Sequence, residues 1–406
     1  MIRSFTARLF ATILTVLVFA SAWAQTPPPA EDTDAPKAPE ALSADTYELV
    51  GQNPISQYDA LREHLRKMIK GTRNPEAYGI YVEETHSPLV LIDHNGSSGF
   101  NPVEAQILLT SAAALELFGG QHRFRTTVTP AGTLQNGVLT GHLIVRGTGD
   151  PTIGTTFYME KQPRKFNAFE TFEDWAHQIK AAGINTVAGA LVLDDTAFDD
   201  QLVAPEWPQD RSGHPIVAQV SALSFRDNCV DIYLDAGWRK RTKVKAEMFP
   251  GIYATLHSGV LASPKGSEPD VKVRRRGDSN IVEVLGTIPV RSEYRTRASI
   301  HDPSLYFGTI LRKVLVEEGV DVYRSKPRKR VDYKDDAALT SLGSPVVSHF
   351  SPRLNQIVPP MIRRQRFETA DHVFKALGYS RERKGSFKTG AQAVDYFFRI
   401  SGIDKG

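Results

Sequence analysis

The stretch "FNPVEAQILLTSAAALELFGG", residues 100–120, holds the helix from which the fold can be read. Asn101 suits an N-cap, Pro102 suits the first helical position, and a closing glycine pair favours termination. The residues between are apolar on nearly every face, which predicts a helix buried on all sides. The first turn nevertheless carries Glu104 and Ile107, one turn apart on a single face.

The size and charge of the chain limit the classes of function. A chain of 406 residues predicts two or three compact units, and a hydrophobic content of 41% is enough for their cores. Its 49 basic and 46 acidic residues nearly cancel, so no nucleic-acid partner is expected. The basic run at 271–278 contains no aromatic residues and is interpreted as a solvated hairpin tip.

The N-terminus has the pattern of a secretory signal peptide over residues 1–24. Arg3 and Arg8 precede an apolar run, and "AWA" at 22–24 offers small residues for cleavage before Gln25. Residues 25–45 then form a Pro/Ala-rich tether. We therefore predict export to the periplasm. Membrane contact is expected only through an uncleaved signal peptide, whose apolar run is short for a bilayer span.

The remaining chain alternates strand and helix patterns around a β-rich middle. Strands are predicted at 77–84 and 88–94, and Thr171 with Asp174 suggests a capping box at the start of another helix. Asp302 before Pro303 indicates a capped helix. The single cysteine, Cys229, cannot form an internal disulfide and is interpreted as a small buried hydrophobe. Further strands are predicted within 137–154, 186–200 and 220–290, and further helices at 368–377 and 391–400.

This order predicts an α/β (α+β) domain interrupted by an insertion. The outer domain is assigned to 46–126 and 290–406, and the inserted β-rich domains to 127–289. We expect the insertion to have its own apolar core.

Five stretches in order carry a resemblance to a known family. The chain resembles the class C penicillin-binding proteins, a serine-type D-alanyl-D-alanine carboxypeptidase/endopeptidase family that trims peptidoglycan stem peptides. The resemblance implies a β-lactamase-like transpeptidase domain with smaller domains nested in it. The stretches are 100–128, 137–154, 192–200, 220–232 and 349–358.

The chemistry of this family needs three motifs. Ser-x-x-Lys on the buried helix supplies nucleophile and base, Ser-x-Asn lies on the opposite wall, and Lys-Thr-Gly lies on an edge strand beside the oxyanion hole. The resemblance places Glu104 at the serine position and Ile107 at the lysine position of the first motif. In the second motif it places Gln365 at the serine and Phe367 at the asparagine. No catalytic set is therefore intact.

One Lys-Thr-Gly does occur, at Lys388–Gly390, but it leads into residues with helical spacing. In the family this stretch is a helix and the motif follows later, so the match is interpreted as accidental. The domain is accordingly expected to be C-terminally incomplete, with an unpaired strand edge at 77–94.

Other polar side chains have simpler interpretations than catalysis. Glu104 is interpreted as a first-turn acid and Ser111 as a helix-packing residue without a base. The glycine-rich turn at 147–154 is interpreted as structural. Four aspartates (Asp194, Asp195, Asp199, Asp200) are interpreted as a solvated loop. No cofactor or metal is predicted, because the eleven histidines lack ligand spacing.

The sequence thus predicts an exported, catalytically inactive member of this family. Peptidoglycan stem peptides are the candidate non-covalent ligands, and the oligomeric state is left open. Two alternatives remain: an active serine-type carboxypeptidase with a displaced site, and a non-catalytic module that binds peptidoglycan or a partner.

Overall fold

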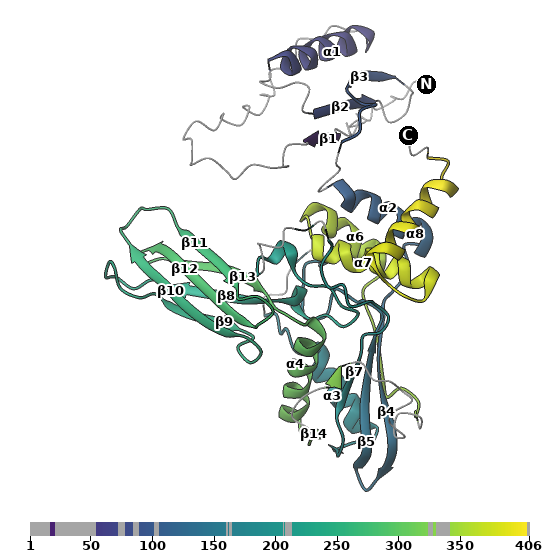
Figure 1. The fold of residues 1–406 in the computed structure, drawn as a ribbon, viewed down its shortest axis with the longest axis vertical. Coiled ribbons are helices and arrows are strands. Elements are labelled where there is room, and N and C mark those ends of the chain that lie inside the picture. The colour runs from purple at the N-terminus through teal and green to yellow at the C-terminus, as the bar shows by residue number, and fades with distance from the viewer. Residues whose placement is uncertain are drawn as a thin grey trace, which may run out of the picture. The chain divides into compact units, whose positions relative to one another are not determined.

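A computed structural model describes the arrangement of most of the chain. It describes residues 17–20, 54–71, 78–83, 89–100, 105–159, 161, 165–205, 207, 213–323, 328–329 and 342–403. The chain divides into two compact units, residues 1–106 and 107–406 (Figure 1). No helix among these described residues has the length and apolar character needed to cross a bilayer.

The first unit contains one helix and a three-stranded antiparallel sheet. The helix is α1 (Pro54–Lys70), and the sheet has the order β1–β2–β3. Ile69 of the helix and three strand residues, Val82, Leu91 and Ile92, form its small apolar cluster. The strands are β1 (Leu17–Ala20), β2 (Tyr78–Glu83) and β3 (Val90–His94).

The two strands expected in this region are confirmed, and the turn between them lies outside the described residues. The edge expected to be open is partly covered, because β1 pairs with β2 from Leu17 opposite Tyr81 to Ala20 opposite Tyr78. This covering strand lies within the predicted signal peptide. Cleavage before Gln25 would remove it and bare the β2 edge.

The second unit is built on a mixed sheet whose central hairpin joins β4 (Arg125–Gln135) and β5 (Val138–Gly147). The main path of the sheet runs β14–β6–β5–β4–β16, and β7 pairs with both β5 and β15. The added strands are β6 (Thr186–Val187), β7 (Leu191–Asp194), β14 (Asp321–Val322), β15 (Arg328–Lys329) and β16 (Val347–Phe350).

Two smaller sheets form a separate β-lobe of this unit (Figure 1). One has the order β13–β8–β9 and the other β10–β12–β11. Their strands are β8 (Cys229–Asp235), β9 (Lys245–Phe249), β10 (Thr255–Ser263), β11 (Asp270–Arg275), β12 (Ile281–Pro289) and β13 (Glu293–Ser299).

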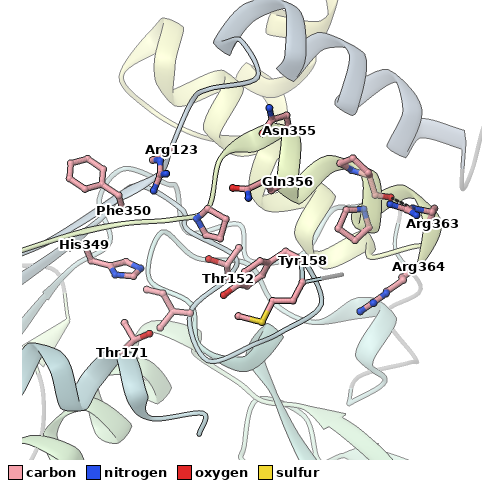
Figure 2. A pocket seen from close by; sticks show the side chains of 15 residues that line it. Arg123, Thr152, Tyr158, Thr171, His349, Phe350, Asn355, Gln356, Arg363 and Arg364 are labelled. Atoms are coloured by element: carbon pink, nitrogen blue, oxygen red, sulfur yellow. Dashed lines mark hydrogen bonds between the residues drawn. The ribbon is translucent and has the colours of Figure 1, made fainter. Parts of the chain in front are cut away.

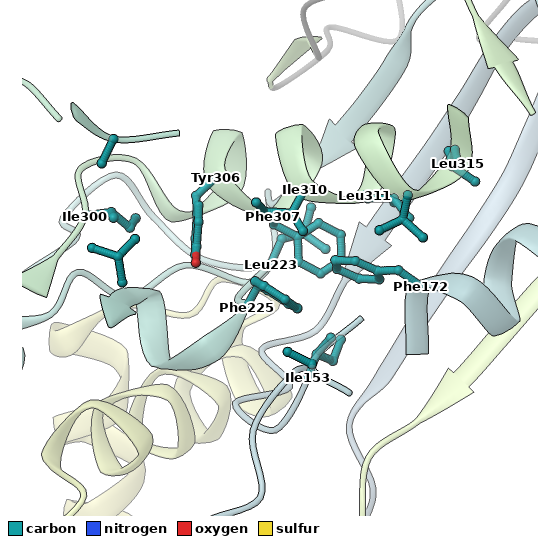
Figure 3. Packing of buried hydrophobic residues seen from close by; sticks show 14 of the residues in the cluster. Ile153, Phe172, Leu223, Phe225, Ile300, Tyr306, Phe307, Ile310, Leu311 and Leu315 are labelled. Atoms are coloured by element: carbon teal, nitrogen blue, oxygen red, sulfur yellow. The ribbon is translucent and has the colours of Figure 1, made fainter. Parts of the chain in front are cut away.

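One large apolar core joins these sheets to helices α3 (Glu170–Ala181) and α4 (Pro303–Glu317). At its centre Phe172 packs against Phe225 and Phe307, with ring centroids 5.0 and 4.9 Å away (Figure 3). Asp302 caps α4 as predicted, since its side chain accepts a hydrogen bond from the Leu305 amide at 3.1 Å.

The expected insertion at 127–289 does not enclose this core. β13 lies beyond 289 and pairs with β8, while β16 pairs with β4. Helix α4 supplies Phe307 and Ile310 to the same core. The elements that share the core therefore extend to Phe350, and residues 127–289 alone lack a complete set of partners.

The predicted capping box of α3 is wrong. The helix begins at Glu170, so Thr171 lies inside the first turn, and the N-cap residue Phe169 provides no side-chain cap. The preceding Asn167 fixes the start instead. Its amide donates to Glu173 Oε2 at 2.7 Å, and its Oδ1 accepts from the Phe169 amide at 3.0 Å.

The remaining helices form a second cluster with its own apolar core. These helices are α2 (Gln106–Phe118), α6 (Leu354–Arg363), α7 (Phe367–Glu382) and α8 (Phe387–Ile400). The opening helix of the sequence is thus confirmed from Gln106 onward. Its burial is one-sided, however: Ala113 and Ala114 are fully buried, whereas Leu108, Leu109 and Leu115 are 37–39% exposed.

The Lys-Thr-Gly sequence lies in the first turn of α8, as predicted, and its residues have structural roles. Ser386 caps the helix by accepting from the Thr389 amide at 2.9 Å, and Thr389 returns a capping-box contact. Gly390 permits the close approach of α7. A Cβ there would lie 2.6 Å from both the ring and the carbonyl oxygen of Phe374. This helical position agrees with the interpretation that the match to a carboxylate-binding motif is accidental.

We predict that Gly390→Ala destabilises the chain although alanine favours helices. Overpacking costs about 1–3 kcal/mol, against about 1 kcal/mol gained from helix propensity. Because one obstructing atom is a backbone oxygen, the net loss should be about 1–2 kcal/mol in urea unfolding.

The control is Lys388→Ala, which alters an exposed side chain of the same triplet. It should change the free energy of unfolding by less than about 0.5 kcal/mol. A larger loss from Lys388→Ala than from Gly390→Ala would contradict the structural role of the triplet.

Candidate functional site

The corner between α6 and α7 carries the positions that the family resemblance assigns to the Ser-x-Asn motif. Gln365 has a left-handed backbone, with φ of 48°, so the chain reverses within three residues. The Arg366 amide donates to the Met361 carbonyl at 2.9 Å, and the Gln365 amide donates to the Ile362 carbonyl at 3.1 Å. These bonds hold the corner in one conformation.

Gln365 and Phe367 both line a pocket of about 270 Å³ at this corner. Gln365 is exposed, and the Phe367 ring packs edge-on against Trp207 with centroids 5.8 Å apart. The pocket is also lined by Pro215, Ile216, Asp227, Cys229, Arg297, Arg364, Arg366 and Glu368.

The structure does not bring Ile107 into this pocket. Ile107 is 6% exposed and belongs to the apolar cluster that also contains Val358 and Met361 of α6. Its carbonyl accepts a hydrogen bond from Ser111 Oγ at 2.6 Å, which confirms Ser111 as a helix-packing residue. Glu104 lies outside the described residues.

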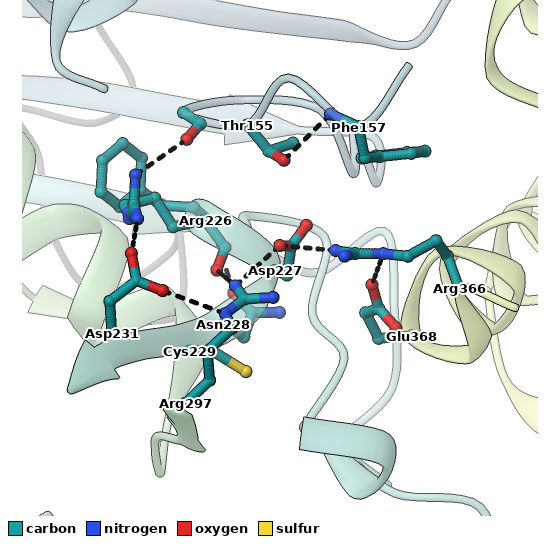
Figure 4. Close-up of polar contacts among 12 residues, drawn as sticks. Thr155, Phe157, Arg226, Asp227, Asn228, Cys229, Asp231, Arg297, Arg366 and Glu368 are labelled. Atoms are coloured by element: carbon teal, nitrogen blue, oxygen red, sulfur yellow. Dashed lines mark hydrogen bonds and ion pairs between the residues drawn. The ribbon is translucent and has the colours of Figure 1, made fainter. Parts of the chain in front are cut away.

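A buried charge network lies beside the corner and was not predicted from the sequence (Figure 4). Asp227 binds Arg297 at 2.7 Å and Arg366 at 2.5 Å. Arg366 in turn binds Glu368 at 2.6 Å. A second carboxylate, Asp231, pairs with Arg226, with Arg295 at 3.0 Å and with Arg297 at 3.3 Å. The guanidinium of Arg297 therefore joins the two carboxylates.

In this network, burial and neighbouring charges shift the pKa values of the carboxylates in opposite directions. Burial would raise the pKa of Asp227, but Arg297 and Arg366 outweigh it and hold that pKa below its ordinary value. Burial raises the pKa of Glu368 above its ordinary value despite Arg366. Burial also raises the pKa of Cys229 to about 12, so its thiol stays protonated and unreactive, as a buried hydrophobe.

One feature of the sequence, the adjacent Asp227 and Asn228, could have pointed to this network. Arg226, Asp227 and Asn228 have consecutive positive φ angles of 51°, 58° and 54°, in the 3₁₀ turn η6 (Arg226–Asn228). Asp and Asn tolerate this region better than most residues, and such strain often marks a constrained site. The partners Arg297 and Arg366 come from distant segments and could not be paired with Asp227 by spacing.

A serine–histidine pair also escaped the sequence analysis. Ser224 Oγ lies 2.5 Å from His372 Nε2, while His372 Nδ1 lies 2.5 Å from the Glu368 carbonyl. The Nδ1–H therefore donates to that carbonyl, and Nε2 accepts from the serine. His372 is 1% exposed, and burial lowers its pKa to about 4. Because both side chains are buried, the pair holds α7 to the 221–228 turn.

The interpretation of the four aspartates as a solvated loop is wrong for three of them. Asp194 binds Arg146 at 2.6 Å, and Asp195 accepts from Ser304 at 2.6 Å and from Ser221 at 3.2 Å. Asp199 pairs at 2.7 Å with Lys375, a fully buried lysine. Only Asp200 is exposed as expected. Within the described part of the chain, no group of potential ligands is arranged to hold a metal ion.

A larger cavity, of about 1020 Å³, lies on the other side of α6 (Figure 2). It is bounded by α6, by the end of β16, and by the turn after β5 with the first turn of α3. The glycine-rich turn predicted to be structural thus contributes Thr152 and Ile153 to its wall.

Comparison with known proteins identifies the family. The family model described as the D-Ala-D-Ala carboxypeptidase 3 (S13) family matches residues 61–406. D-alanyl-D-alanine carboxypeptidase of Actinomadura sp. (strain R39) is 25% identical over 80% of this chain and 58% of its own length. D-alanyl-D-alanine carboxypeptidase DacB of Haemophilus influenzae is 23% identical over 81% of this chain and 64% of its own. The chain thus spans about three fifths of these relatives.

A solved structure has the same fold. Penicillin binding protein 4 (dacB) of Haemophilus influenzae superposes with a TM-score of 0.66 at 22% identity, covering 81% of this chain and 68% of that one. The same protein complexed with a β-lactam superposes with a TM-score of 0.61. The fold is therefore the mixed α/β fold of penicillin binding protein 4 with its additional β-sheets, and the chain belongs to the D-Ala-D-Ala carboxypeptidase 3 (S13) family.

Proposed function

We propose that this protein is an exported, non-catalytic member of its family that binds peptidoglycan stem peptides without covalent chemistry. The apolar environment of Ile107 is the observation that carries the proposal. Ile107, which the resemblance assigns to the family's lysine position, lies in an apolar cluster where an ionised amine would be strongly disfavoured.

No other lysine of the described helical cluster is placed to take over this role. Lys375 is the buried lysine there, but its amine binds Asp199 at 2.7 Å and donates to the Gln201 carbonyl at 2.7 Å. Aromatic rings of Phe198 and Phe387 cover it further. A fully buried amine held by these partners is out of reach of a substrate, so it cannot act as a base.

The opposite wall lacks its polar pair as well. An Asn can hold a substrate amide, whereas the Phe367 ring offers no hydrogen bond and is packed on Trp207. The neighbouring Arg366 is committed to Asp227 and Glu368. The corner is therefore shaped as a fixed polar rim that could contact a peptide without activating it.

The alternative of an active enzyme with a displaced site needs a nucleophile beside a base. The Ser224–His372 pair has that composition, but the two side chains are only 2% and 1% exposed. The histidine is also neutral and committed to a backbone carbonyl. This geometry favours the non-catalytic proposal.

The direct test is an assay for release of D-alanine from a stem-peptide analogue. We expect no release above the uncatalysed rate, because loss of a nucleophile and its base costs on the order of 10⁶-fold in turnover. The relative DacB of Haemophilus influenzae, assayed in parallel, is the positive control. Release that Ser224→Ala abolishes would instead establish the displaced-site alternative.

A second prediction concerns restoration of the first motif. The double variant Glu104→Ser with Ile107→Lys should not release D-alanine, because Gln365 and Phe367 leave the opposite wall without its polar pair. Since the introduced lysine would also enter an apolar cluster, the thermal midpoint should fall relative to Ile107→Met, a volume-matched control. Measurable turnover by the double variant would show that the opposite wall is functional.

A third prediction concerns export. Mass spectrometry of the protein from the cell envelope should find a mature N-terminus at Gln25, because the preceding residues have the pattern of a signal peptide. An intact N-terminus at Met1 would mean that residues 17–20 remain available to pair with β2.

A further inference from the structure

The cavity of about 1020 Å³ is lined by basic and hydrogen-bonding side chains that have no role in the proposed function. Its volume lies at the upper end of the roughly 300–1,000 Å³ typical of ligand pockets. It belongs entirely to the second unit and shares one wall residue, Arg364, with the smaller pocket that Gln365 and Phe367 line. Its wall consists of Arg123, Thr152, Ile153, Tyr158, Met159, Thr171, His349, Phe350, Pro352, Asn355, Gln356, Pro359, Pro360, Arg363 and Arg364.

Among the described residues of the wall, three are arginines and none carries a carboxylate. None of Arg123, Arg363 and Arg364 forms an ion pair with a described residue. No described carboxylate neutralises their positive charges. In the buried network, by contrast, the arginines all bind carboxylates (Arg226, Arg295, Arg297 and Arg366). Unpaired guanidinium groups around a concave surface attract anionic ligands and favour carboxylates, which match their paired N–H donors.

The arginines lie at two ends of the cavity. Figure 2 shows Arg123 on one side and Arg363 with Arg364 on the other, with Tyr158 and Gln356 between them. Three prolines also line the cavity and add apolar surface to its wall. A ligand with anionic groups at both ends and a partly apolar, hydrogen-bonding middle fits this order, and a short peptide has these properties.

The first turn of α3 adds a further donor. Thr171 lines the cavity, and its backbone N–H has no hydrogen-bond partner within the described segments. The neighbouring Phe172 and Glu173 amides donate instead to the Phe169 carbonyl at 2.8 and 2.9 Å. The N-cap residue Phe169 provides no side-chain cap, but Glu170 and Glu173 in the first turn offset part of the positive charge at this end of α3.

Three carboxylates, those of Asp150, Glu170 and Glu173, lie near the cavity, but none of them is part of its described wall. Asp150 lies behind the wall, 1% exposed, and its Oδ2 faces His349 Nε2 at 3.4 Å. Glu173 is bound by Asn167 and does not line the cavity. Burial raises the pKa of Tyr158 on the wall, and Asp150 and the exposed Glu170 in the first turn of α3 raise it further, so these two carboxylates offset part of the positive charge. The described wall itself carries three arginines and no carboxylate, and the surface in contact with a ligand is therefore net basic.

We propose that this cavity binds an acidic peptide with at least two carboxylates, one held at the Arg123 end and one at the Arg363–Arg364 end. The site does not depend on the proposed lack of catalysis. A peptide is favoured over a phosphate polymer because apolar surface separates the two groups of arginines.

The test measures fluorescence anisotropy of labelled hexaglutamate with the full chain, with hexaglutamine as the neutral probe. We expect saturable binding of hexaglutamate, and a dissociation constant raised about tenfold by Arg123→Ala and by Arg363→Ala separately. The matched control is Lys272→Ala, which removes an exposed charge from β11 outside the cavity and should change binding less than twofold.

Circular dichroism of each variant checks that the exposed substitutions leave the fold unchanged. Equal weakening by Lys272→Ala would mean attraction to overall charge and would overturn the proposal, as would the absence of hexaglutamate binding at low salt. Binding of tripolyphosphate without binding of hexaglutamate would overturn the peptide assignment. Binding of hexaglutamate supports the peptide site whether or not the chain releases D-alanine, so the outcome of the D-alanine assay bears only on the proposed lack of catalysis.

Discussion

The Asp227 carboxylate is held by two guanidinium groups that come from parts of the chain far apart in sequence. Arg297 lies on β13, and Arg366 lies at the corner between α6 and α7. Removing one member of a buried ion pair leaves an uncompensated charge and costs about 3–5 kcal/mol. This contact therefore fastens the helical cluster to the β-lobe and fixes the position of the corner.

The fixed corner explains how the fold can persist in the non-catalytic protein that we propose. The helices α2, α6, α7 and α8 share one apolar cluster, to which Ile107 belongs. An apolar residue at that place fits this packing better than the lysine that the family resemblance expects there. The buried pairs Lys375–Asp199 and Ser224–His372 add polar contacts that orient α7, and none of the four residues lines either of the two cavities described above. If the proposed function is correct, the packing of these helices does not require the family's catalytic residues.

Local patterns made part of this fold predictable. The alternation in β2 and β3, the cap at Asp302 and the helical spacing after Lys388 are set by neighbours within a few residues, and the structure confirms all three. The absence of a Ser-x-x-Lys motif is likewise a local property of the sequence. The resemblance located the corner at 365–367, because it follows the order of motifs along the chain.

Features that depend on contacts between distant segments could not be predicted from local patterns. Asp194 and Asp195 are buried because Arg146, Ser221 and Ser304 reach them from other elements. The start of α3 depends on Asn167, which the predicted capping box did not include. Helix α6 was not predicted, because its two interior prolines count against a helix although its apolar residues have helical spacing. The arginines beside it could be recognised as one group only once β16 and the turn after β5 were known to line the same cavity.

The central claim is that no residue of this chain forms an acyl-enzyme, and intact-protein mass spectrometry after incubation with benzylpenicillin tests it most directly. With Glu104 at the assigned serine position and Ile107 buried in an apolar cluster at the assigned lysine position, we expect an unchanged mass. A family relative treated in the same way is the positive control. A stoichiometric increase by one penicilloyl group, located on any side chain by peptide mapping, would contradict the account.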